Sequence, residues 1–447
     1  MPSKKVCIFT TFSEISEAYS LNRIVQDQLK MLLSHGYSPT VIVAESFEPA
    51  GIYADSRVTL KRIPNVPVYN EVKKDESFDD DVKKLEVALT NILKDVDVVI
   101  THDVIYQNAA LKHNLAARKV ADGLPGLKWL HWIHSATSPV TLANLKPIFG
   151  DQYLEVITKP FPNSFYVFFN YYSVPRVAQN FGVPQEIVRV VHHPSDLQAV
   201  FGLSEDVARL VSDKKIYSAD AICVYPIRLD RGKQVQMVIK TMAMLKEFEL
   251  SVKVIIVDFH STGGDKVTYR DELKNLAIDW GLNSDEIIWT SEVKEQWNVE
   301  IPHEDVMGLM RMSNVFIMPS VSESYSLITQ EAGLNKCVVV LNQDFPPFRD
   351  IFGPHAIYKK YSSSIDLMAD LAELDNSPTD TKYGPGKATE EERGAWEKKY
   401  HKGTAGMIAS QLRNNDNLAL SIFLRKYRNL DYIFEHELSP LFFEEMK

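Results

Sequence analysis

Short apolar runs alternate with longer amphipathic segments along most of the chain. The first run, 6–9, is followed by segment 20–34, in which apolar residues recur every three or four positions. A short run rich in β-branched residues indicates a buried strand, and the wider spacing indicates a helix with one buried face. Repetition of this pair predicts βα units around a parallel sheet.

The pattern predicts two such series. In the first, strands are expected at 6–9, 40–43, 58–63, 96–101, 129–133, 165–169 and 187–191, and helices at 20–34 and 82–93. In the second, strands are expected at 221–226, 252–257, 286–290, 314–318 and 336–341, and helices at 234–248, 269–280, 304–312 and 326–334. These two series predict two doubly wound, Rossmann-like α/β domains that face a cleft. Ligands bind such folds beyond the carboxyl ends of the strands.

The domains are expected at 1–198 and 199–415. Polar residues interrupt the rhythm at 375–404, which predicts a long loop or insertion. Helices are expected to resume at 406–412 and 418–434. The last segment, 416–447, is expected to be helical and to pack back on the first domain.

Composition changes this picture little. The chain has 447 residues, of which 45% are hydrophobic and 24% charged, as in ordered globular proteins. A formal charge of −10 disfavours non-specific binding of polyanions. Three cysteines in or beside expected strands are interpreted as buried apolar residues in a reducing compartment. With neither a signal peptide nor an apolar run of membrane-spanning length, a cytoplasmic location is expected.

Two glutamates flank an expected turn. Segment 319–333 follows the expected strand 314–318 and carries Glu323 and Glu331, with seven residues between them. Backbone N–H groups and the positive end of a helix favour an anion at such a point. The segment predicts an anion site with an acid on either side; a helix with two surface glutamates is the alternative.

Basic residues follow the first strand of the second series. Arg228 and Lys233 lie in the segment Arg-Leu-Asp-Arg-Gly-Lys, directly after 221–226. An Arg fork and a Lys point charge can neutralise a diphosphate and offset the charge on a departing group. A diphosphate site is therefore predicted, and a solvated charged loop is the alternative.

Together these segments resemble the retaining glycosyltransferases of the GT-B fold, most closely the GT4-like group. The resemblance rests on two βα series and on Glu-x7-Glu after a strand that ends in Pro-Ser. It implies that Glu323 lies by the transferred sugar and that Glu331 holds the nucleotide ribose. The family also has an Arg and a Lys at the separation of Arg228 and Lys233.

One turn departs from the family pattern. The family usually has Glu-Gly-Phe-Gly, whereas Ser324 and Ser326 replace both glycines here, with Tyr325 between them. The resemblance implies that these three residues contact the donor. The replaced glycines keep open a catalytically silent protein that binds a nucleotide sugar.

A histidine follows an expected strand of the first series. His134 comes directly after 129–133, where family members often carry a histidine that bonds to the donor sugar. It matches this position better than His131, and a structural histidine is the alternative. The residues expected on the acceptor side, on loops after two other strands, are Ser13, His102 and Asp103.

The sequence does not predict a metal or cofactor site, because the candidate motifs are either misplaced or missing. Asp95-Val96-Asp97 resembles the Asp-x-Asp of metal-dependent transferases, but it precedes a strand and so lies at the wrong end of the sheet. Adjacent His192 and His193 diverge on an extended segment. Dinucleotide and P-loop glycine motifs are missing from the sequence. We expect no essential metal and no cofactor other than the nucleotide-sugar co-substrate.

The resemblance implies a metal-independent hexosyltransferase-type enzyme that moves a sugar from a nucleotide-diphosphate donor to an acceptor hydroxyl with retention of configuration. An epimerase or hydrolase of nucleotide sugars on the same fold is the alternative. The acceptor stays open among glycans, small molecules, proteins and nucleic acids. Membrane docking is disfavoured, because segment 20–34 has only two basic residues, Arg23 and Lys30.

Overall fold

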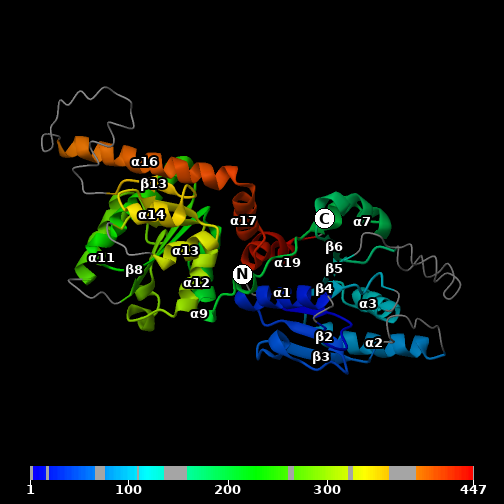
Figure 1. Ribbon diagram of the computed structural model, residues 1–447. Coiled ribbons are helices and arrows are strands. Elements are labelled where there is room, and N and C mark those ends of the chain that lie inside the picture. Colours follow the sequence, from blue (N-terminus) through cyan, green and yellow to red (C-terminus); the bar gives the residue numbers. More distant parts are fainter. Residues whose placement is uncertain are drawn as a thin grey trace. The chain divides into compact units, whose positions relative to one another are not determined.

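The computed structural model describes residues 4–16, 20–65, 76–107, 110–134, 159–259, 266–320, 326–361 and 389–445. The chain divides into two units (Figure 1). Unit 1 comprises Met1–Asp196 and Tyr427–Lys447, and unit 2 comprises Leu197–Lys426. The chain therefore leaves unit 1 once and returns to it with its last residues.

The chain passes between the units twice, and at each crossing an ion pair holds the last residue before the crossing within its own unit. Asp196 stays in unit 1, where its Oδ2 lies 2.6 Å from Nζ of Lys30. Lys426 stays in unit 2, where its Nζ lies 2.6 Å from Oδ1 of Asp220. The division thus falls two residues before the expected boundary after residue 198, and the return to unit 1 comes later than residue 416.

Unit 1 is built on a seven-stranded parallel sheet in the order β3-β2-β1-β4-β5-β6-β7. Its strands are β1 Val6–Phe9, β2 Thr40–Ala44, β3 Thr59–Ile63, β4 Val98–His102, β5 Lys128–Trp132, β6 Ser164–Phe168 and β7 Val188–Val190. Its helices are α1 Ser20–Ser34, α2 Phe78–Leu93, α3 Leu111–Gly123, α7 Val174–Phe181, α18 Leu430–Ile433 and α19 Ser439–Phe443.

Unit 2 is built on a six-stranded parallel sheet in the order β10-β9-β8-β11-β12-β13. Its strands are β8 Ala221–Arg228, β9 Val252–Phe259, β10 Ile287–Trp289, β11 Val315–Met318, β12 Val338–Asn342 and β13 Ile357–Lys359. Its helices are α8 Leu197–Phe201, α9 Glu205–Asp213, α10 Val235–Met244, α11 Lys266–Asp279, α12 His303–Met312, α13 Leu327–Leu334, α14 Pro346–Phe352, α16 Glu390–Asn414 and α17 Asp416–Tyr427, which ends at the division.

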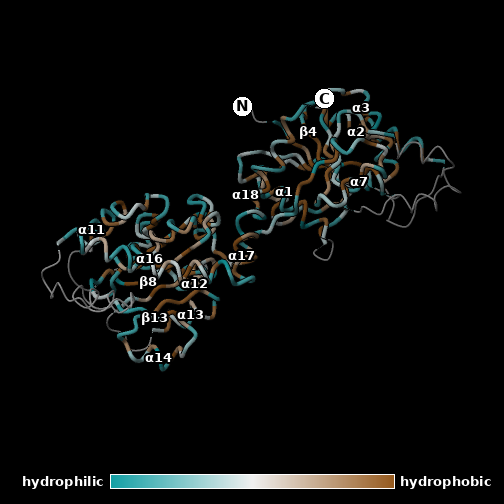
Figure 2. The backbone as a smooth tube through the Cα atoms, turned by 90° about the horizontal axis from the view of Figure 1, so that it is seen from above, coloured by the Kyte–Doolittle hydropathy of each residue, from teal (hydrophilic) through white to brown (hydrophobic). Residues whose placement is uncertain are grey.

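The sheets are buried on both faces, which explains why their strands are apolar throughout. In β1, Cys7 and Phe9 pack into one apolar cluster while Val6 and Ile8 pack into another. Successive side chains of a strand point to opposite faces, so each face needs its own covering layer. Figure 2 shows apolar stretches of the backbone running through the interior of each unit. Each such fully buried aliphatic or aromatic side chain stabilises the fold by about 1.5–3 kcal/mol.

The predicted α/β class with two doubly wound domains is confirmed. The expected strands lie within two residues of the observed bounds, whereas β13 was not expected. Helix α2 begins at Phe78 instead of residue 82, because its first turn holds three aspartates, which the positive end of a helix favours. Cys7 and Cys223 are buried, as expected, while Cys337 is half-buried.

The prediction of a loop at 375–404 is wrong for residues 389–404. These residues begin α16, whose start is fixed by a capping box: the Thr389 side chain accepts from the backbone N–H of Glu392, and the Glu392 side chain accepts from that of Thr389. Residues 362–388 lie outside the described residues. The helix expected at 418–434 is interrupted before Asn429, which caps α18.

No helix in the described part of the chain is long and apolar enough to cross a membrane.

Candidate functional site

The strand orders locate a ligand edge in each unit. In unit 2 the direction of winding reverses between β8 and β11, and in unit 1 it reverses between β1 and β4. Loops from neighbouring parallel strands leave the sheet side by side at such a point, and ligands bind there. The predicted site residues that the structure describes lie on the loops or strand ends at these carboxyl edges, or on the helix that follows.

In unit 2, Arg228 and Lys233 lie on one short loop. Arg228 ends β8 with 47% of its side chain exposed, and its Nε lies 3.8 Å from Oδ2 of Asp230. Lys233 ends a 3₁₀ turn whose shape is fixed by the Tyr225 hydroxyl, which donates to the Lys233 carbonyl at 2.8 Å. Two cations are thus held on a defined loop at the carboxyl edge of the sheet. Such a loop is suited to an anion such as a diphosphate.

A third cation of this loop is directed elsewhere. Arg231 lies 2.8 Å from Glu272 and stacks over the Tyr269 ring at 4.6 Å. Its charge is therefore compensated within unit 2, by residues of α11.

The loop after β11 starts from a buried anchor. Ser320 is buried, and its carbonyl accepts a hydrogen bond from Nδ2 of Asn342 at 3.0 Å. Glu323, Ser324 and Tyr325 lie outside the described residues, so their predicted roles stay predictions.

Ser326 begins α13 in a left-handed conformation, with φ 70° and ψ 75°. This is the region that favours glycine. Its Oγ lies 2.8 Å from Oγ1 of Thr329, within the first turn of the helix. The backbone there has a glycine-like shape although the residue is serine.

Because of this conformation, Ser326→Gly should be more stable than Ser326→Ala by about 1 kcal/mol. Glycine adopts positive φ without strain, while alanine keeps the strain and loses the hydroxyl. The free energy of unfolding, measured by denaturant titration, checks this order. At Ser421, exposed in α17, the order should reverse, because alanine is preferred in a helix interior. If the glycine variant were the more stable, or the alanine variant the more stable, at both positions, the assignment of a strained backbone to Ser326 would be contradicted.

Glu331 lies on α13 with a partner that the sequence did not indicate. Its Oε1 is 3.7 Å from Nε2 of His303, the first residue of α12, whose side chain is 74% exposed. Nothing in the sequence around His303 marks it, because the pairing depends on how two helices pack. The Glu331 carboxylate is 28% exposed and so accessible to a ligand.

In unit 1, the structure brings together His102, Asp103 and His134. His102 ends β4, and its Nδ1 lies 3.0 Å from Nε2 of His134, which follows β5. Tyr106 joins the group: its hydroxyl accepts from the His134 backbone N–H at 2.9 Å and donates to the Asp103 carboxylate. Ser13 is exposed on the loop after β1, and its carbonyl accepts from the Ser46 hydroxyl at 3.5 Å.

Burial sets the charges of this group. It raises the pKa of Asp103 to about 6, against the lowering effect of the Tyr106 hydrogen bond. Burial, together with the neighbouring His193, lowers the pKa of His134 to about 4. It also lowers the pKa of His102 well below its usual value. At neutral pH the site therefore offers two uncharged imidazoles and one carboxylate.

His131, the less favoured sequence candidate, is a core residue. It is fully buried between aromatic rings, and its Nδ1 lies 2.9 Å from the Thr101 hydroxyl. It lies within β5 and not after it, so it is not at the carboxyl edge. His134 is the histidine at the edge, as the sequence predicted.

Comparison with known families bears on unit 2. Residues 207–383 match the model of a family described as glycosyl transferases group 1. The matched residues all lie in unit 2. The matched stretch contains Arg228, Lys233 and the whole Glu-x7-Glu segment. No curated protein sequence matches the chain.

Solved structures resemble this chain distantly. One is a glycosyltransferase from Rickettsia africae, with 13% identity, a TM-score of 0.34, and 98% of each chain covered. Another is a sucrose-phosphate synthase from Thermosynechococcus elongatus, with 14% identity, a TM-score of 0.32, and 94% of this chain and 100% of that chain covered. Anabaena HepE in complex with UDP-glucose has 14% identity and a TM-score of 0.29, with 94% of this chain and 99% of that chain covered. No property is transferred from likenesses this distant.

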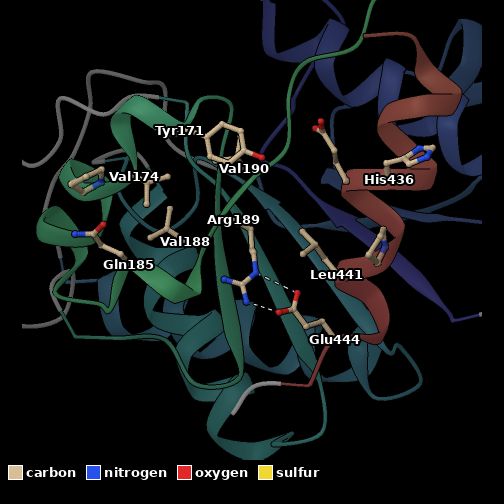
Figure 3. Close-up of a pocket in the computed structure, with 12 residues that line it drawn as sticks. Tyr171, Val174, Gln185, Val188, Arg189, Val190, His436, Leu441 and Glu444 are labelled. Carbon is tan, nitrogen blue, oxygen red and sulfur yellow. Dashed lines mark hydrogen bonds and ion pairs between the residues drawn. The ribbon is translucent and has the colours of Figure 1, made fainter. Parts of the chain in front are cut away.

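A groove of unit 1 is lined by none of the predicted residues. It has a volume of about 510 Å³ and lies between the edge strand β7 and the C-terminal segment. Figure 3 shows Arg189 and Glu444 facing each other across it; Nε of Arg189 lies 3.3 Å from Oε2 of Glu444. Arg189 and Glu444 therefore compensate each other's charge.

Asp97 and the two adjacent histidines have the positions that the sequence indicated. Asp97 lies before β4, where its Oδ2 accepts from the Lys5 backbone N–H at 2.8 Å. His192 bonds to Glu437 at 3.0 Å, while the His193 ring stacks on Phe169 at 4.9 Å, so the adjacent histidines diverge. Within the described ranges, no group of three or more His, Cys, Asp or Glu residues could hold a metal.

Proposed function

We propose that the chain transfers a sugar from a nucleotide-diphosphate donor to an acceptor hydroxyl with retention of configuration. The observation that carries the proposal is the match of residues 207–383 to the group 1 glycosyltransferases. The matched stretch contains Arg228, Lys233, Glu323 and Glu331. A cationic loop beside a helix start at a switch point suits a nucleoside diphosphate.

In the proposed reaction, Arg228 and Lys233 hold the diphosphate and Glu331 holds the ribose. The bond between the anomeric carbon and the diphosphate oxygen breaks, while the acceptor oxygen forms its bond to that carbon from the same face. The acceptor proton passes to the departing phosphate oxygen. Glu323 and His134 orient the sugar ring, and Arg228 and Lys233 offset the charge that builds on the leaving group.

Donor turnover with and without candidate acceptors tests the proposal. A glycosyltransferase releases nucleoside diphosphate faster when its acceptor is present, and the product keeps the anomeric configuration of the donor. Equal release without any acceptor would indicate a hydrolase, and conversion of the donor sugar alone would indicate an epimerase. Donor binding with no turnover over a panel of glycans, small molecules, proteins and nucleic acids would indicate a silent binding protein.

Activity should survive EDTA, with a rate within about twofold of the untreated enzyme. We expect this because Arg228 and Lys233 supply positive charge to the leaving group, which a metal ion supplies in other transferases. Initial rates before and after chelation and desalting check it. Loss of activity that Mg²⁺ or Mn²⁺ restores would replace this part of the proposal with a metal-assisted mechanism.

A further inference from the structure

Three residues from three elements of unit 1 form a continuous hydrogen-bonded chain. Gln28 of α1 is buried, with 1% of its surface exposed, and its Oε1 lies 2.8 Å from Nε2 of His102. His102, 2% exposed at the end of β4, contacts Nε2 of His134 through its Nδ1 at 3.0 Å. The order is therefore Gln28, His102, His134, from the core to the carboxyl edge of the sheet.

The chemistry of the first link sets the direction of the others. An amide oxygen only accepts hydrogen bonds, so Nε2 of His102 carries a proton. His102 is uncharged because burial holds its pKa well below the usual value, so its Nδ1 carries a lone pair. Nε2 of His134 must then donate, and because the pKa of His134 is lowered to about 4 by burial, its Nδ1 also carries a lone pair.

Among the described residues, the groups around His134 bond to its polar atoms other than Nδ1. The His134 backbone N–H is already bonded to the Tyr106 hydroxyl, and the ring lies parallel to that of His193, with centroids 6.1 Å apart. Among the described residues, the side-chain hydrogen bond of His134 is the one to His102.

We propose that Gln28 is a positioning residue that, through His102, holds His134 in the tautomer whose Nδ1 accepts a hydrogen bond. His134 therefore recognises a group that donates, which on a sugar is a neutral hydroxyl. A carboxylate in the same place would be repelled, because its oxygens and Nδ1 of His134 would both present lone pairs. The identity of the recognised group as a sugar hydroxyl rests on the proposed function, whereas the tautomer does not.

Gln28→Met should release the relay, because it removes the acceptor that keeps the proton on Nε2 of His102. Gln28→Glu should keep the relay, because a carboxylate oxygen accepts from Nε2 of His102 as the amide oxygen does. His134 should therefore keep its tautomer in Gln28→Glu and lose it in Gln28→Met.

Nitrogen NMR of ¹⁵N-histidine protein reads this directly, with the His134 signals assigned by His134→Gln. We expect protonated Nε2 and bare Nδ1 in the wild type and in Gln28→Glu. A wild type with protonated Nδ1 on His134 would overturn the proposal.

Gln28→Met keeps the length of the side chain and removes the acceptor, and a thermal melt checks that it folds. His134 should lose its single tautomer and show averaged nitrogen signals, whereas Gln179→Met, an exposed change of the same kind on α7, should leave the wild-type pattern. Gln28→Leu, which also lacks an acceptor, has the same expected result if Gln28→Met does not fold. A single Nε2-protonated tautomer in the folded variant would show that Gln28 does not set it.

Kinetics separate this proposal from the proposed function. With the donor found by the turnover assay, Gln28→Met should lower kcat/KM by about twofold or more, while Gln28→Glu and Gln179→Met should not. The expected tautomers without any turnover in the wild type would defeat the proposed function and leave the positioning role standing. Averaged tautomers in Gln28→Met with unchanged kcat/KM would overturn the recognition of a hydroxyl by His134.

Discussion

Arg228→Ala and Lys233→Ala should each weaken binding of a nucleoside diphosphate about 30-fold, equivalent to about 2 kcal/mol. Removing a charged contact in a desolvated site costs about 2–5 kcal/mol, and the lower end applies because Arg228 is half-exposed in the absence of ligand. The two residues share one ligand, so the double variant need not show the sum. Calorimetric titration with UDP, ADP and GDP measures the effect.

Arg231→Ala is the matched control for both variants. It removes the same charge from the same loop, but its guanidinium is engaged by Glu272 and Tyr269. Nucleoside diphosphate affinity should change by no more than about twofold, because long-range effects of one exposed charge are screened by salt. Normal affinity in the Arg228/Lys233 double variant would contradict the assignment of this loop to the diphosphate.

The two glutamates should have different kinetic effects. Glu331→Gln should raise the donor KM about tenfold and leave kcat nearly unchanged, because contacts to ribose are equal in the ground and transition states. Glu323→Gln should lower kcat about 100-fold, because positive character develops at the anomeric carbon only as the bond breaks. Steady-state kinetics on both proteins, with thermal melts, measure the difference.

His303→Asn controls for an indirect effect at Glu331. The 3.7 Å contact between the two side chains means that Glu331→Gln also changes the surroundings of His303. If ribose binding is the cause, His303→Asn should leave the donor KM within about twofold. Should both glutamates only decorate a helix, their variants would shift stability by about 0.5–2 kcal/mol and keep wild-type kinetics.

The edge at which the site lies was predictable because strand ends are marked in the sequence. A residue such as Arg228 or His102 stands where an apolar run stops, and the parallel arrangement of βα units brings all such positions to one side of a sheet. The start of α16 was also readable, since Thr389 and Glu392 have the spacing of a capping box. It was missed because the surrounding residues are polar and the apolar period is weak.

Contacts between distant elements could not be predicted in this way. Tyr106 bonds to His134, and Gln28 to His102, only because β4 lies beside β5 and α1 packs on their sheet. These pairs are 28 and 74 residues apart in the sequence. A hydropathy pattern locates each element but carries no information on which polar side chains meet across the packed layers.

The division of unit 1 into two stretches of sequence has a consequence for how the protein is made on the ribosome. Phe434, Leu438 and Phe442 pack in the same apolar cluster as Ile8 of β1, although more than four hundred residues separate them. Domains generally fold as they emerge during translation, with the N-terminal part first. Unit 1 must therefore wait, with that apolar surface uncovered, until the whole of unit 2 has been synthesised. Nascent chains stalled before residue 427 should be the form of this protein that most needs a chaperone.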